Sequence, residues 1–92
     1  MTTIDTYEIA SSIIDDVCMF RPEFVGVDFT GSAIIDLIES AFGYIEQHLE
    51  NVDATALERA ELLASVRLEI MAMCLSCSTD NAERIYNERK AA

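Results

Sequence analysis

The sequence AIIDLIESAFGYIEQHLENV at residues 33–52 carries the clearest helical pattern in the chain. Apolar side chains recur there at intervals of three and four residues, at Ile35, Ile38, Phe42, Ile45, Leu49 and Val52. This spacing is typical of a helix that packs at a shallow angle against a partner helix. Four acids occupy the opposite side, namely Asp36, Glu39, Glu46 and Glu50. The pattern predicts a helix over residues 32–50 with one apolar and one acidic face.

Three further helices are predicted around this one. Apolar and acidic residues separate onto two faces over residues 4–20, and Pro22 ends that helix because proline cannot continue it. Thr55 followed by Glu58 forms a capping box at the start of a helix over residues 54–76. Asp80 as N-cap, with Glu83 three residues later, predicts a last helix over residues 80–90.

The helix over residues 54–76 is apolar nearly all the way round. Such a helix has to be covered on several sides, so it is either the central element of the fold or part of a subunit interface. The expected fold is all-α, a small antiparallel bundle of three to four helices. Residues 1–92 form a single domain in this prediction, and the helices over 32–50 and 54–76 form a hairpin.

The chain is strongly acidic. It has 17 Asp and Glu against 6 Lys and Arg, so its net charge is 6 − 17 = −11. Residues 1–58 hold twelve acids and one base, giving 1 − 12 = −11, and the rest sum to zero. This charge excludes direct binding to nucleic-acid phosphate and disfavours an anionic membrane surface. A hydrophobic content of 51% argues against a disordered acidic chain.

The amino terminus and the cysteines indicate the compartment. The first residues, MTTIDTYEIA, lack the positive charge of a secretory signal, and no stretch of the chain is apolar enough to span a membrane. The three cysteines, Cys18, Cys74 and Cys77, are an odd number. We therefore expect reduced thiols in the cytoplasm, including that of a host cell.

Four patterns were weighed as chemical sites. Cys74 and Cys77 form a single C-x-x-C, which with Cys18 and His48 could supply zinc ligands, but buried structural cysteines explain it better. Residues 28–39 partly match a calcium loop, yet Ala33 replaces the glycine of its sharp turn. His48 is expected to pack on the apolar side of its helix. No glycine-rich phosphate loop or acid–base pair is present, so we expect no enzyme, cofactor or metal.

The fourth pattern is the acidic surface. The predicted helix over residues 32–50 spreads its four acids over about 21 Å along the helix axis, and the predicted helix over residues 4–20 carries a second acidic stripe. The simplest explanation is a solvated face that keeps the protein soluble. Like charges three and four residues apart cost stability, however, and residues 1–58 contain only Arg21 as a base. That cost favours a role for the acids in binding.

The leading hypothesis is a non-enzymatic protein that docks on a basic, nucleic-acid-handling surface of a partner protein, as an inhibitor or nucleic-acid mimic. Its size and acidity are similar to those of phage and mobile-element counter-defence proteins, such as anti-CRISPR and antirestriction proteins. The predicted binding residues are Asp36, Glu39, Glu46, Glu50, Glu8, Asp15 and Asp16, with Phe24 and Phe29 as apolar anchors. The alternative is a structural or adaptor module that homodimerises through residues 54–76, with acids that only confer solubility.

Overall fold

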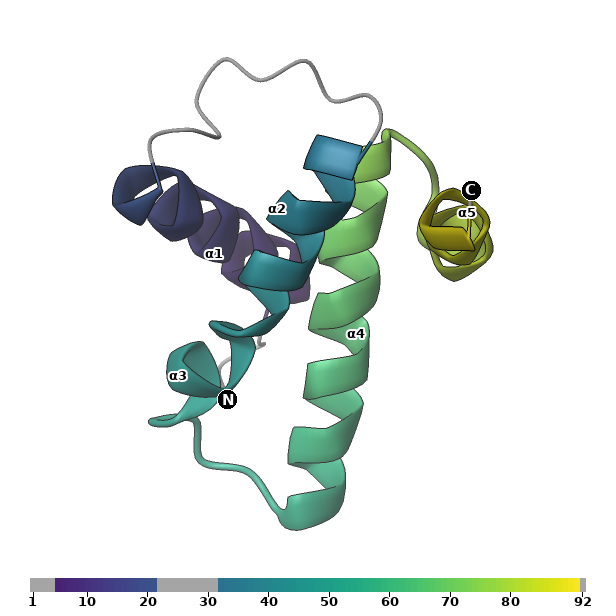
Figure 1. Cartoon of the computed structure of the whole chain (residues 1–92). Helices are drawn as coiled ribbons and strands as arrows, with labels where there is room; N and C mark the ends of the chain where they lie inside the picture. The colour runs from purple at the N-terminus through teal and green to yellow at the C-terminus, as the bar shows by residue number, and fades with distance from the viewer. Residues whose placement is uncertain (1–4, 22–31, 92) are drawn as a thin grey trace.

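A computed structural model describes residues 5–21 and 32–91 of the chain. These residues form α1 (Thr6–Phe20), α2 (Ser32–Phe42), α3 (Ile45–Leu49), α4 (Ala56–Leu75) and α5 (Thr79–Ala91), shown in Figure 1. No strand occurs within these two ranges, and the predicted all-α class is confirmed. The boundaries of a single domain over residues 1–92 stay a prediction.

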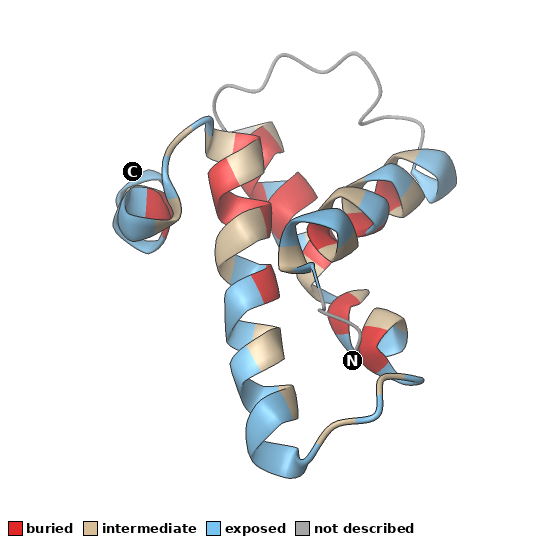
Figure 2. Ribbon diagram, turned by 180° about the vertical axis from the view of Figure 1, so that it is seen from behind, coloured by how far each residue is buried: buried red, intermediate tan, exposed pale blue. Residues whose placement is uncertain are grey.

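Helix α4 is the central element, because it packs against each of the other four helices. The core gathers around its second half, as the buried residues in Figure 2 show. The largest fully buried side chains are Ile13, Val17, Ile34, Leu37, Ile38, Ile45, Leu49, Val66, Ile70 and Met71. The helix predicted over residues 54–76 is thus the central element of the fold, which was the first of the two explanations for its apolar surface. The other four helices pack against α4, and its buried residues lie in its second half.

The helix predicted over residues 32–50 is wrong in one respect: the structure breaks it into α2 and α3. The amides of Gly43 and Tyr44 donate to the carbonyls of Ser40 and Ala41, at 3.2 and 3.0 Å. These hydrogen bonds join residues three apart, as in a 3₁₀-helix, and not four apart as in an α-helix. Glycine weakens a helix, so the chain can turn at this point. The turn still leaves Ile45 and Leu49 buried, so the apolar spacing survives although the straight helix does not.

Two of the predicted helix ends are explained by caps. Helix α1 begins at Thr6 because the Asp5 carboxylate accepts hydrogen bonds from the amides of Tyr7 and Glu8, at 3.0 and 3.3 Å. Helix α4 begins with the predicted capping box. The amide of Thr55 donates to Glu58 at 3.1 Å, and the amide of Glu58 donates to the Thr55 hydroxyl at 3.2 Å. These bonds with Thr55 lower the pKa of the Glu58 carboxyl.

The start of α5 differs from the prediction. Ser76 adopts a left-handed conformation, with φ of 55° and ψ of 49°, and ends α4. Helix α5 then begins at Thr79, so Asp80 lies in its first turn and is not the N-cap. An acid in the first turn still faces the positive end of the helix dipole.

Among the described helices, none is long and apolar enough on its own to cross a membrane. Helices α4 and α5 reach that length only together, and they bend by 70° at the break between them.

Candidate protein-binding surface

The four acids predicted on residues 32–50 are all exposed. Asp36 and Glu39 lie on α2, whereas Glu46 and Glu50 lie on and directly after α3. Because α2 and α3 point in different directions (Figure 1), the single straight stripe of about 21 Å was wrong. The acids instead form two short groups on either side of the turn at Gly43 and Tyr44.

One of these acids is neutralised by a distant cation. The Lys90 ammonium of α5 donates to the Glu39 carboxylate at 3.2 Å, and this hydrogen bond raises the pKa of Lys90. Asp36, Glu46 and Glu50 form no ion pair with any residue in the described ranges. Three of the four predicted binding acids therefore keep their full charge toward solvent.

The acids of α1 also include residues with and without an ion-pair partner. Glu8 and Asp15 are exposed and have no ion pair within residues 5–21 and 32–91. Asp16 is only half-exposed, and its carboxylate lies 2.8 Å from Nε2 of His48. His48 is half-buried at the edge of α3, so it is a boundary residue that joins α3 to α1. Asp16 thus has a structural contact and is not freely available to a partner.

A second set of contacts lies beside Asp16 and His48. The Arg21 guanidinium donates to the Ser40 hydroxyl at 2.7 Å. The rings of Phe20 and Tyr44 stack with 6.5 Å between their centroids and 3° between their planes. These contacts hold the end of α1 against the turn between α2 and α3. The end of α1 is therefore fixed beside the turn that separates the two groups of acids on α2 and α3.

Two exposed apolar side chains on this surface were missed by the sequence reasoning. Met19 and Phe20 are 71% and 67% exposed. Met19 follows Asp15 by four residues and therefore lies on the acidic face of α1, which was the available signal. The predicted anchors Phe24 and Phe29 lie outside the described residues. Met19 and Phe20 are thus the apolar side chains that the structure places beside the acids.

The three cysteines lie in the core or pack against it. Cys74 is buried, Cys18 and Cys77 are half-buried, and all three are free thiols. Burial, with a smaller contribution from the nearby Cys18, raises the pKa of the Cys74 thiol to about 12. Within the described part of the chain, no three His, Cys, Asp or Glu side chains gather closely enough to hold a metal ion. Asp28 of the partial calcium loop lies outside those residues.

The burial of Cys74 leads to a testable prediction. Alkylation with iodoacetamide at pH 8 should modify Cys18 and Cys77 well before Cys74, because only the thiolate reacts and Cys74 remains protonated. Mass spectrometry of the digested protein measures each site, and labelling in urea provides the unfolded control. Equal rates at all three thiols in the native protein would contradict the placement of Cys74.

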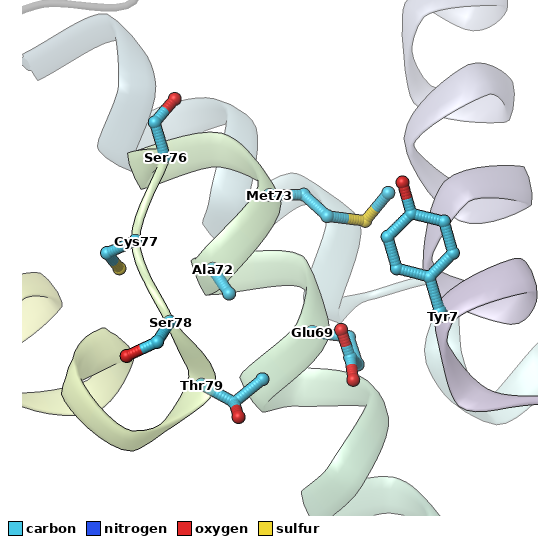
Figure 3. Close-up of a pocket in the computed structure, with 8 residues that line it drawn as sticks. All are labelled: Tyr7, Glu69, Ala72, Met73, Ser76, Cys77, Ser78 and Thr79. Carbon is cyan, nitrogen blue, oxygen red and sulfur yellow. The ribbon is translucent and has the colours of Figure 1, made fainter.

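The largest of the described pockets has a volume of about 660 Å³ and lies between the first turn of α1, the end of α4 and the start of α5. In Figure 3 the Tyr7 ring faces the Met73 side chain, and the Glu69 carboxylate lies beside them. The other lining residues are Ala72, Ser76, Cys77, Ser78 and Thr79. The pocket contains hydroxyls and a thiol but no histidine next to them, so its geometry shows no activated nucleophile.

Comparison with known proteins finds no matching family model, no similar curated protein and no similar solved structure. The acidic surface therefore has to be interpreted from its own charge and geometry.

Proposed function

We propose that this chain is a non-enzymatic binding protein whose acidic surface docks on a basic, nucleic-acid-binding surface of another protein. One observation carries the proposal: five exposed acids of the α1–α3 region have no ion pair with a described residue, namely Glu8, Asp15, Asp36, Glu46 and Glu50. Arg21 is the one base among residues 1–58. Such a surface produces a negative field that steers a positively charged partner toward it.

A nucleic-acid-binding protein is the partner that this field fits best. Surfaces that bind phosphate groups concentrate Lys and Arg, and an acidic protein can occupy them in place of the nucleic acid. Met19 and Phe20 add exposed apolar area beside the acids, while Phe24 and Phe29 remain predicted anchors. The proposed role is that of an inhibitor or nucleic-acid mimic of the anti-CRISPR or antirestriction type, acting in the cytoplasm.

The experiment compares two variants of equal charge. The first replaces the predicted acids, as Asp36→Asn, Glu39→Gln, Glu46→Gln and Glu50→Gln. The control replaces Glu61, Glu69, Glu83 and Glu88 of α4 and α5 by Gln. Both change the net charge from −11 to −11 + 4 = −7. The partner is captured from the source cell at low salt, and stopped-flow mixing measures its association with each variant.

We expect the first variant to associate about tenfold or more slowly at low salt and to depend less on salt, because electrostatic steering acts on the association rate. The control variant should associate within about threefold of the wild type. The wild type should also displace nucleic acid from the partner. Equal rates for all three proteins would instead support the alternative that the acids only confer solubility.

A further inference from the structure

The last two turns of α1 present carboxylates together with exposed apolar side chains. Asp15 and Met19 are four residues apart, so they lie side by side on the surface of the helix. The same spacing places Asp16 beside Phe20. Met19 and Phe20 are 71% and 67% exposed. A carboxylate next to an exposed aromatic ring offers two different attractions to one cation, a hydrogen-bonded ion pair and a cation–π contact.

The Phe20 ring is held in place with one face open. Its plane lies 3° from that of the Tyr44 ring, with 6.5 Å between the ring centroids, which is an offset stack. Tyr44 is half-buried and packs against the core, so it holds the stack from the protein side. Because Tyr44 can cover only one face of the Phe20 ring, and Phe20 is 67% exposed, the opposite face is open to solvent.

The neighbouring carboxylate is also held in place. Oδ2 of Asp16 lies 2.8 Å from Nε2 of His48, whereas Oδ1 forms no hydrogen bond with a residue in the described ranges. An ionised carboxylate has sites for about four hydrogen bonds, so Oδ1 can still accept one from another molecule. The contact with His48 therefore orients Asp16 and leaves one of its oxygens available, one helical turn from the Phe20 ring.

Arginine is the cation that fits this arrangement best. A guanidinium stacks flat on an aromatic face and still presents N–H donors at its edge, whereas the lysine ammonium is compact and strongly hydrated. The chain contains one contact of this kind, since Arg67 lies 4.2 Å from the centre of the Phe42 ring. Among the described residues no cation lies over the Phe20 ring, and the next base along the chain, Arg21, donates to Ser40.

We propose that Phe20 and Asp16 form a binding site for an arginine side chain of the partner protein. The guanidinium stacks on the open face of Phe20 and donates to Oδ1 of Asp16, while Met19 packs against its methylene groups. The charge of the chain favours a cation from outside, because residues 1–58 hold twelve acids and one base. This inference rests on the proposed function, since it names the group that the basic partner supplies.

Two small probes test the site without any partner. One is a blocked dipeptide of two arginines, and the other is a blocked dipeptide of two lysines with the same charge. NMR titration measures the affinity of the protein for each probe and locates the contact. We expect the arginine probe to bind at least about threefold more tightly, because only its guanidinium gains the stacking contact. The largest chemical-shift changes should occur at Asp16, Met19 and Phe20.

Phe20→Leu removes the ring and keeps an apolar side chain. It should lower the affinity for the arginine probe until the two probes bind within about 1.5-fold of each other. Tyr7→Leu is the matched control, because it removes a ring that is 56% exposed in the first turn of the same helix. The control should keep the preference for arginine. Since Phe20 is largely exposed, circular dichroism should show the helical content of the wild type in both variants.

Three results would overturn the arginine site. They are the absence of chemical-shift changes at Phe20 up to about 20 mM arginine probe, equal affinity of the wild type for both probes, and an undiminished preference in Phe20→Leu. The failure of this inference is distinct from that of the proposed function. Slower association of the acid-neutralised variant without a preference for arginine refutes the site alone. A preference for arginine with unchanged association of that variant refutes the proposed function alone.

Discussion

Replacing Ile70 by alanine should lower the free energy of unfolding by about 2–5 kcal/mol. Ile70 is 0% exposed and lies in the half of α4 that the other helices cover. The truncation removes buried apolar surface and leaves a cavity that the surrounding helices can fill only partly. Domains of this kind are stable by about 5–15 kcal/mol, so the loss is a large fraction of the total. Urea titration followed by circular dichroism measures it.

The matched control for this variant is Leu57→Ala. It removes the same number of carbon atoms from the same helix, but at a side chain that is 70% exposed. Measured by the same urea titration, it should change the stability by less than about 0.5 kcal/mol. Similar losses for Ile70→Ala and Leu57→Ala would contradict the division of α4 into a buried half and an exposed half.

Replacing Arg59 by glutamine should cost about 2–3 kcal/mol, the second largest effect that we expect. The Arg59 guanidinium, in the first turns of α4, donates to the carbonyls of Leu49 and Val52, the latter at 2.7 Å. Leu49 is the last residue of α3, so the cation lies at the negative end of that helix. Loss of the guanidinium leaves two carbonyls in a partly buried region with weaker hydrogen bonds.

Two comparisons separate this role from a general effect of charge. Arg59→Lys keeps the charge but cannot present the forked donor group, so its loss should be intermediate. Arg89→Gln makes the same charge change at an exposed position on α5 and should cost less than about 0.5 kcal/mol. Urea titration of the three variants gives the values. An equal loss for Arg59→Gln and Arg89→Gln would contradict the hydrogen bonds to α3.

The predicted helices were correct where the signal is local. The capping box depends on Thr55 and Glu58, which are three residues apart. Helix α1 ends at Phe20, in agreement with the end that was predicted from the proline two residues later in the sequence. The break at Gly43 was not predicted, because one glycine is tolerated in many helices and the direction of α3 depends on what it packs against. The start of the last helix was predicted at residue 80 and lies at Thr79 for a similar reason, since the turn that precedes α5 depends on the left-handed Ser76.

For the candidate surface, the helical periodicity already predicted that Asp36, Glu39, Glu46 and Glu50 would be exposed. It could not predict which acids are neutralised. Lys90 and Glu39 are 51 residues apart in the chain, and His48 and Asp16 are 32 apart. Such pairs form only when packing brings their helices together.

The amino-acid sequence alone determined the all-helical class, the two-faced helices and the large negative charge, because these properties arise from residues within a few positions of one another or from a simple sum. Only the tertiary structure decided that α4 is central in its second half and open in its first, because burial depends on contacts with α1, α2, α3 and α5. It likewise decided which acids keep their charge toward solvent, since each ion pair between helices joins residues that are distant in the chain.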